Sequence, residues 1–372
     1  MKHADIIVIG GGATGAACAL GLVREKAGTV LMLDETPGIH RVSRANFGLT
    51  TYMLKGLNDP AYAEWALQAT KKWPEFGSGL EGETGITIDL SLDGGGEAFL
   101  SEQEKETRIR QNRQLKDMAD KRGSEYPARV LDRYEFSQLI PKMELGDAVT
   151  GGMFVPGAGH VNPLFMLRAI RKAFLIRGGT FIPGESVMEI TPDKSHTLVK
   201  TGTHAYACDK LVVAAGHGST RLLDALGIRL PLYPLRGQLM VTNRMPPLLP
   251  IPLLNVRQTA EGTFMIGVSL EHAGHDVRTT VDVMKAQAQK AIAVFPMMAG
   301  LNWVRSWAAI RVMTPDDSPV YDTVPGFNNI FILAGHSAVS LAPLHASIIP
   351  QWIISRKKPG EIQRFGLGRF HV

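Results

Sequence analysis

Cysteine is nearly absent from this chain of 372 residues, which has only Cys18 and Cys208. The two lie far apart in sequence, each inside an apolar run. This usage excludes a disulfide framework, a zinc site and a cysteine-ligated iron–sulfur cluster. Metal-ligand spacings and nucleophile motifs are also missing, so we expect no metal. The low cysteine content is typical of a cytoplasmic protein.

Long apolar runs, basic tracts, internal repeats and low-complexity segments are missing as well. No run reaches the ~18 apolar residues that a membrane-spanning helix needs, and no secretory signal is evident. The net charge of +5 is small and dispersed, which excludes a nucleic-acid-binding footprint. Hydrophobic residues make up 45% and charged residues 20% of the chain, as in ordinary folded proteins. The length predicts two domains or one large composite domain.

The opening residues carry the clearest pattern. Ile6 to Ile9 is a short, continuously apolar run, typical of a parallel strand buried on both faces. Gly10, Gly12 and Gly15 follow in G-x-G-x-x-G spacing: the first permits a tight turn, the second close approach to a pyrophosphate, and the third helix packing. Residues Ala16 to Lys26 then read as a helix whose N-terminal amides face the phosphates.

A second predicted strand, Thr29 to Leu33, ends in Asp34. A carboxylate at this position accepts hydrogen bonds from a ribose diol and disfavours a phosphorylated ribose. The pattern therefore predicts a dinucleotide site for NAD or FAD and argues against NADP.

The rest of the chain decides between the two cofactors. An NAD domain normally completes six parallel strands within about 150 residues. Here two helical segments intervene, at Tyr62 to Phe76 and Glu102 to Arg122. The remaining nucleotide-domain signals come much later: a helix at Leu164 to Arg177 and strands at Lys210 to Ala214 and Ile330 to Leu333. A nucleotide domain assembled from separated segments suits a flavoprotein.

Five stretches carry a family resemblance. They are D-I-I-V-I-G-G-G-A-T-G at the start, G-H-V-N-P-L at 159–164, A-C-D-K-L-V-V-A-A-G-H-G-S at 207–219, L-R-G-Q at 235–238, and I-R-V-M-T-P-D-D-S-P with I-F-I-L-A-G-H-S near the end. Over essentially the whole chain the sequence resembles the D-amino-acid oxidase superfamily of FAD enzymes, which includes glycine and sarcosine oxidases. S-R-A-N-F-G-L at 43–49 and G-H-S-A-V-S-L-A-P at 335–343 look most like the flavoprotein subunit of bacterial opine oxidases and D-hydroxyproline dehydrogenases.

The resemblance implies a fold of the α/β plus α+β class. A glutathione-reductase-like, FAD-binding Rossmann domain would be built from three segments, 1–80, 149–231 and 305–372. Segments 81–148 and 232–304 would form a substrate domain around an antiparallel sheet. Extended stretches at Gln238 to Thr242 and Thr263 to Val268 fit such a sheet.

The residues expected at FAD come partly from the patterns above and partly from the resemblance. They are Gly10, Gly12, Ala13, Thr14, Gly15, Asp34, Glu35, Ser43, Arg44, Asn46, Gly48, Val187, Ala215, Gly216, Gly335, His336, Ser337, Ala338 and Val339. A polar loop around Ser43, Arg44 and Asn46 can bring amides and a guanidinium to anionic oxygens. The helix expected to begin near Ser337 would support negative charge on the reduced flavin.

Arg311 and His336 are the candidates for catalysis. The resemblance implies that Arg311 holds the substrate carboxylate, and a planar guanidinium can do so through two parallel hydrogen bonds. A structural salt bridge is the alternative for Arg311. His336 either contacts the substrate or orders the turn that contains it.

Other residues have simpler interpretations. Asn162 before Pro163 predicts a helix N-cap, and we expect His160, Arg236 and Gly237 to be structural as well. Arg257 is either a partner for a second substrate carboxylate or, more commonly for a strand arginine, exposed. Where glycine oxidases have an active-site tyrosine, this chain has Leu254 and Asn255, which argues against a glycine-like substrate.

These observations predict an FAD-dependent oxidoreductase that takes a hydride from the carbon next to a secondary or cyclic amine, passes it to flavin N5 and leaves an imine. The substrate would be amino-acid-like, such as an opine or D-hydroxyproline. No general base is identifiable. The resemblance also implies a hetero-oligomer with a second redox subunit. The alternatives are a self-contained glycine, sarcosine or D-amino-acid oxidase that uses oxygen, and a non-catalytic flavin-binding subunit.

Overall fold

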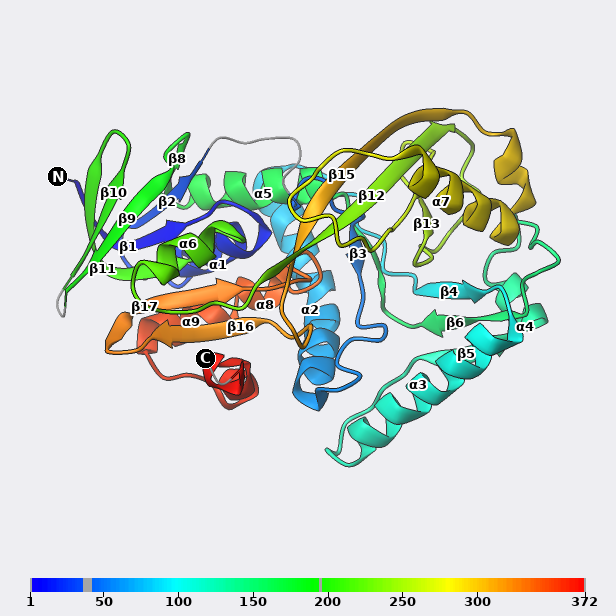
Figure 1. Cartoon of the computed structure of the whole chain (residues 1–372), viewed down its shortest axis with the longest axis horizontal. Coiled ribbons are helices and arrows are strands. Elements are labelled where there is room, and N and C mark those ends of the chain that lie inside the picture. The colour runs from blue at the N-terminus through cyan, green and yellow to red at the C-terminus, as the bar shows by residue number, and fades with distance from the viewer. Residues whose placement is uncertain (1, 36–41, 194–195, 371–372) are drawn as a thin grey trace.

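The computed structural model describes residues 2–35, 42–193 and 196–370. An eight-stranded sheet fills the left half of Figure 1. Its parallel strands, in spatial order, are β17 (Phe327–Ala334), β11 (Ala205–Val213), β1 (Lys2–Ile9), β2 (Val30–Asp34) and β8 (Thr180–Pro183). Antiparallel strands β16 (Val320–Val324), β10 (Thr197–Thr201) and β9 (Val187–Pro192) extend it.

Both faces of this sheet are covered, which is why β1 reads as a continuous apolar run. Ile6, Ile7 and Val8 are fully buried. One face packs against helices α1 (Ala13–Arg24), α2 (Pro60–Thr84), α5 (Pro163–Ile176), α8 (Ala342–His345) and α9 (Ile348–Ser355). The other face is covered by α6 (Gly218–Asp224) and by side chains of β9 and β10.

A second layer occupies the right half of Figure 1. Its four-stranded sheet has the order β13-β14-β12-β15, and the long strands β12 and β15 cross the middle of the molecule. The members are β12 (Tyr233–Arg244), β13 (Val256–Gln258), β14 (Thr263–Ile266) and β15 (Trp303–Met313), with α7 (Val281–Val294) and the short helix η1 (Pro296–Gly300) beside them. The layer has its own apolar core around Phe264 and Phe295.

Smaller elements complete the chain. A three-stranded sheet has the order β4-β6-β5, with β4 (Gly95–Phe99), β5 (Arg129–Asp132), β6 (Gly151–Val155) and helices α3 (Glu102–Asp120) and α4 (Arg133–Gln138) beside it. β3 (Leu49–Thr50) pairs with β7 (Gly159–His160), and the C-terminal region forms η2 (Gly360–Phe365) and η3 (Leu367–Phe370).

The predicted fold class is confirmed, with informative differences at element ends. The first helix begins at Ala13, three residues before the predicted start, and the segment after β17 turns through residues 338–341 before α8 begins at Ala342. Two predicted domain boundaries, 148/149 and 304/305, lie close to β6 and inside β15. β15 pairs with β12 of the four-stranded sheet, and β6 pairs with β4 and β5 of the three-stranded sheet.

Three sequence-based exclusions can be compared with the structure. Cys18 and Cys208 are both buried and unpaired. Across residues 2–35, 42–193 and 196–370, no group of three or more potential metal ligands is found. Within the same ranges, no helix has the length and apolar character needed to cross a membrane.

Candidate functional site

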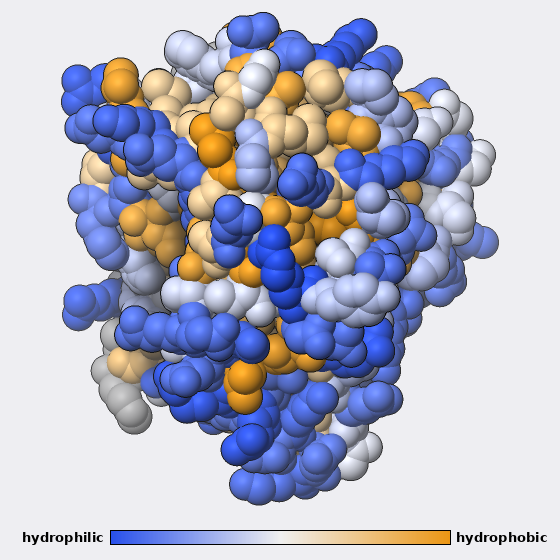
Figure 2. Space-filling view, turned by 90° about the vertical axis from the view of Figure 1, so that its right-hand side faces the viewer, coloured by the Kyte–Doolittle hydropathy of each residue, from blue (hydrophilic) through white to orange (hydrophobic). Residues whose placement is uncertain are grey.

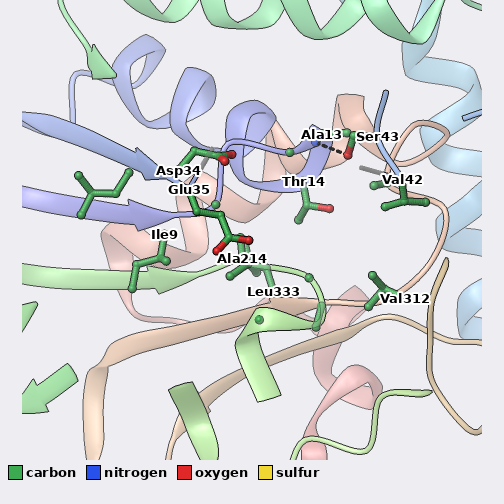
Figure 3. A pocket seen from close by; sticks show the side chains of 18 of the residues that line it. Ile9, Ala13, Thr14, Asp34, Glu35, Val42, Ser43, Ala214, Val312 and Leu333 are labelled. Carbon is green, nitrogen blue, oxygen red and sulfur yellow. Dashed lines mark hydrogen bonds between the residues drawn. The ribbon is translucent and has the colours of Figure 1, made fainter. Parts of the chain in front are cut away.

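A narrow cavity of about 160 Å³ lies at the carboxyl ends of β1, β2, β11 and β17. This is the edge of a parallel sheet at which ligands usually bind. Figure 3 shows Asp34 and Glu35 toward one end of the cavity, Thr14 in its middle, and Val42, Ser43 and Val312 toward the other end. Its lining includes thirteen of the residues predicted for FAD: Gly10, Gly12, Ala13, Thr14, Asp34, Glu35, Ser43, Arg44, Val187, Ala215, Gly216, Gly335 and Ala338.

The first glycines are required by close backbone contacts. Gly10 has φ +105°, and a Cβ atom placed on it would lie 2.3 Å from the carbonyl oxygen of Ala214. A Cβ atom on Gly15 would lie 1.9 Å from the carbonyl oxygen of Gly10. Gly15 is outside the cavity lining, and its absent side chain lets α1 pack directly against the turn. These contacts leave the cavity open where β1 meets α1.

The N-terminus of α1 is completed by a distant residue. Its N-cap, Gly12, has no side chain to offer, and the hydroxyl of Ser43 accepts a hydrogen bond from the amide of Ala13 at 3.0 Å instead. This contact, drawn in Figure 3, is the physical reason that the helix begins earlier than predicted. It also fixes the Ser43 segment against the glycine turn.

Asp34 is held in place by its surroundings. One carboxylate oxygen accepts a hydrogen bond from the amide of Gly11 at 2.6 Å and lies 3.7 Å from the guanidinium of Arg171. Arg171 in turn donates to the carbonyl oxygen of Gly11 and lies over the ring of Phe181. Burial lowers the pKa of Arg171, and the charge of Asp34 opposes that shift. The carboxylate is thus oriented at the end of β2, where a ribose diol is expected.

A second, larger cavity of about 590 Å³ adjoins the first, and Val42 lines both. Its walls come from both layers: the segment after β3, the end of β17, and strands β12 and β15. Predicted residues Asn46, Arg311, His336, Ser337 and Val339 line it. The two predicted residues outside the described linings of both cavities are Gly15 and Gly48. Gly48 has φ +90° and lies against the carbonyl oxygen of Val161, where a Cβ atom would be 2.2 Å away.

Arg311 extends from β15 into the second cavity. Its Nη1 donates to the carbonyl oxygen of Ser269 at 2.9 Å and of Arg236 at 3.3 Å. Among the described residues, no carboxylate lies within ion-pair distance of it. The alternative of a structural salt bridge is therefore wrong for the described part of the chain. Burial lowers the pKa of Arg311 to about 10, so the group stays charged at neutral pH.

A hydrogen-bond cluster faces the same cavity, centred on the hydroxyl of Ser337. Tyr62 donates to this hydroxyl at 2.9 Å, Lys55 donates to it as well, and His336 Nδ1 lies 3.1 Å away. A hydroxyl accepts two hydrogen bonds and donates one, so the cluster is saturated when Ser337 donates to His336. Burial, then the charges of Lys55 and Arg311, lower the pKa of His336 to about 3. His336 is therefore neutral at physiological pH.

Asn162 and Arg236, both interpreted as structural, make structural contacts, whereas Gly237 lines the second cavity. Asn162 accepts hydrogen bonds from the amides of Leu164 and Phe165, with Pro163 at the first helical position. Arg236 is buried and ion-paired with Glu271.

The expectation that Arg257 is exposed is wrong. It is 3% exposed, donates to the carbonyl oxygen of Phe47, and lies 2.8 Å from His160 Nδ1. The described linings of both cavities omit it. Arg257, on β13, thereby holds the segment before β3 in place, because its guanidinium donates to the carbonyl oxygen of Phe47 and to His160 Nδ1.

Sequence reasoning missed Arg171 and Lys55. Arg171 lies one turn after buried Leu167, at the border of the apolar face of α5, and helical periodicity could have singled it out. Lys55 follows an irregular stretch without periodicity, and no local signal indicates that its ammonium group turns inward.

The residues present fit FAD. Small residues at the ends of β1, β11 and β17 make a cradle that added Cβ atoms would fill, and the glycine turn places the start of α1 beside it. The cradle continues through Val42 into the larger cavity, so an extended dinucleotide can have its diphosphate at α1 and its ring system beside His336 and Arg311.

Comparisons with known proteins agree with this geometry. The family model described as FAD dependent oxidoreductase matches residues 5–352. The chain is 34% identical to an opine oxidase subunit of Agrobacterium tumefaciens over 100% of its own length and 99% of that protein. The corresponding subunit of Rhizobium meliloti is 32% identical, with 100% and 98% covered. The crystal structure of glycine oxidase from Geobacillus kaustophilus superimposes with a TM-score of 0.89 at 24% identity, with 99% of each chain covered.

Proposed function

This chain belongs to the FAD dependent oxidoreductase family and oxidises amines or amino acids. From this premise we propose that its substrate is an opine-like secondary amine. The two relatives described above, each more than 30% identical over nearly its full length, are both opine oxidase subunits. D-hydroxyproline-like cyclic amines belong to the same chemical class and remain within the proposal.

The observation that carries the proposal is that Arg311 faces the larger cavity with hydrogen-bond donors still free for a ligand. Its guanidinium lines the 590 Å³ cavity, uses Nη1 for two backbone carbonyls, and has no carboxylate within ion-pair distance among the described residues. The charge of Glu271 acts on it from farther away, and that carboxylate is already ion-paired with Arg236. A buried cation is stable only with a hydrogen-bonded counter-charge, so a carboxylate-bearing ligand completes the site. The remaining donors of the planar fork suit two parallel bonds to that carboxylate.

The protein's own residues position the substrate. Arg311 fixes the carboxylate, and neutral His336 adds no second positive charge where the amine binds. When bound, the flavin supplies the oxidation, accepting a hydride equivalent from the carbon next to nitrogen, and the product imine can hydrolyse in water. We assign no general base; the substrate amine binds in its neutral form.

The test is an anaerobic absorbance spectrum of the purified holoprotein before and after addition of single opines, D-hydroxyproline, sarcosine or glycine. Bleaching of the flavin by an opine or D-hydroxyproline supports the proposal. Bleaching by glycine or sarcosine alone would favour the self-contained oxidase. A flavin that stays oxidised with all of them would contradict the proposed substrate class.

We also propose that the chain works with a second subunit. The Agrobacterium and Rhizobium relatives are each one subunit of an opine oxidase, and several large apolar side chains of this chain are exposed, with Val281, Trp303 and Val304 between 61% and 73% accessible. Figure 2 shows the right-hand end of Figure 1, where apolar side chains gather in the upper and central part of the face and polar ones along the lower edge. Exposed apolar surface of this kind is typical of an interaction site. Native purification that yields the chain alone, with full activity toward a natural electron acceptor, would refute this.

A further inference from the structure

We infer that Lys55, held by Ser337, binds a second substrate carboxylate in the cavity of Arg311, so that the substrate is a dicarboxylate with its amine between the two acids. This inference rests on the proposed function and assigns a specificity-determining residue to it. Arg311 would bind the first carboxylate and Lys55 the second.

Lys55 has few partners within the protein. Its side chain is half-buried, and its ammonium group donates to the hydroxyl of Ser337. An ammonium group has three donors, and the described residues provide no further acceptor and no carboxylate within ion-pair distance. Burial lowers the pKa of Lys55 to about 7, the direction expected for a cation that lacks a counter-ion. An anionic ligand would supply that counter-ion.

Ser337 gives the ammonium group a fixed position. Its hydroxyl is shared by Lys55, Tyr62 and His336, and its backbone has φ +66°, which is uncommon for a residue with a side chain. Both features tie the serine to one conformation at the end of β17. Lys55 therefore presents its charge at a defined place on the cavity wall.

The charges around the cavity support a ligand with two negative groups. Lys55 and Arg311 are the cations of the lining, and neither is ion-paired among the described residues. Two of the three lining carboxylates are already paired, Asp59 with Arg364 and Asp316 with Arg369. The third, Asp317, has no ion pair among the described residues, and burial and then Asp316 raise its pKa.

The two cations belong to different parts of the fold. Arg311 lies on β15 of the four-stranded sheet, whereas Lys55 is bound to Ser337 at the end of β17 of the eight-stranded sheet. Arg311 alone can satisfy one carboxylate through its planar fork. A second cation from another wall is therefore better matched to a second carboxylate than to the same one.

The test uses sulfur analogues that bind without an amine to oxidise. Thiodiacetate has two carboxylates and (methylthio)acetate has one. Each is titrated anaerobically into the FAD holoprotein, and binding is followed by the change in flavin absorbance. Wild type should bind the diacid at least about tenfold more tightly than the monoacid, as expected for one additional charge-assisted hydrogen bond.

Lys55→Met should weaken thiodiacetate binding by roughly 10- to 100-fold, because it removes one hydrogen bond to a charged group. The same variant should change (methylthio)acetate binding by less than about twofold. Lys55→Arg, which keeps the charge, should restore part of the preference. Flavin content checks that each variant is folded, and Lys55→Gln is the substitute should the methionine variant lose FAD.

Equal weakening of both ligands in Lys55→Met would overturn the inference, because it would place both cations on one carboxylate. A wild-type protein without preference for the diacid would overturn it too. Failure of the proposed function is distinguishable: the diacid preference would be present, yet no amine would bleach the flavin.

Discussion

The two adjoining cavities are built in opposite ways. The smaller one is shaped mainly by backbone and by missing side chains at the strand ends of the eight-stranded sheet, with Val312 of β15 also in its lining. The larger one is lined by side chains from both layers of the fold, most of them apolar, with Lys55 and Arg311 as its cations. Residues whose backbone forms the smaller cavity tolerate few substitutions, because an added side chain would fill the space. Side chains that line the larger cavity can be replaced singly, and each replacement can change which ligand binds. The first cavity thus fixes the cofactor, and the second selects the substrate.

The largest effect should come from filling the backbone cradle. In Gly10→Ala the new Cβ atom meets the carbonyl of Ala214 at 2.3 Å on a backbone with φ +105°. Strain and overpacking should together cost roughly 2 to 6 kcal/mol, with loss of FAD. Flavin per chain and the melting temperature measure both effects.

Gly227→Ala is the matched control for that variant, since it also has positive φ, +74°, but open space where the Cβ atom would go. It should cost only about 1 kcal/mol and retain FAD. Equal damage in both variants would show that backbone conformation, and not the tight cradle, decides cofactor binding.

The next largest effect should come from the side-chain cavity. Arg311→Met should lower kcat/KM for the reducing substrate by about 100-fold or more, because two charge-assisted hydrogen bonds are lost. FAD content should not change, since Arg311 is outside the lining of the smaller cavity. Arg311→Lys should recover only part of the activity, as a point charge cannot reproduce the fork. Loss of FAD in either variant would mean that the two cavities are not separable.

A smaller change should displace Arg311 without removing it. A Cβ atom on Gly237 would lie 2.5 Å from the guanidinium nitrogens. Gly237→Ala should therefore shift the clamp and lower kcat/KM about tenfold, the order of effect expected from slight misplacement of a positioning group. Gly300→Ala, with open space around its Cβ position, is the control. An unchanged kcat/KM in Gly237→Ala would argue against a positioned clamp.

The smallest effect expected is a pH dependence of ligand binding. The pKa of Lys55 is lowered to about 7, so its positive charge is present below that pH and lost above it. The Kd for thiodiacetate should rise about threefold between pH 6.5 and 7.5, the change expected for titration of one group. The pKa of His336, about 3, and that of Arg311, about 10, lie outside this window, and burial raises the pKa of Tyr62. Asp317 also lines the cavity and has a raised pKa, so the Lys55→Met variant is the control for its titration.

Lys55→Met should show no such dependence for thiodiacetate, and (methylthio)acetate should show none with either protein. Isothermal or absorbance titration at the two pH values measures this. A threefold change that persists in Lys55→Met would assign the titration to another group.

Sequence patterns were most informative where one short segment makes the whole feature. The strand, the glycines and Asp34 lie within the first 34 residues, and the close contact of Gly15 with the carbonyl oxygen of Gly10 is made within the same segment. The start of α1 was misplaced because its capping group, Ser43, comes from outside the segment. Arg257 was misjudged because an alternating strand pattern does not show that another segment covers that face.

The sequence by itself determined the dinucleotide site and Arg311 as an arginine in need of an anion, because these depend on local backbone requirements and on residue chemistry, and its family resemblance indicated the fold class. Only the tertiary structure decided that Arg311 lacks a carboxylate partner among the described residues, that Ser337 joins Lys55 to Tyr62 and His336, and that the two cavities meet at Val42. Those relations join residues nearly 300 positions apart, Lys55 and Ser337 being separated by 282. Local patterns contain no information on such contacts, since they form only when distant segments of the chain fold against one another.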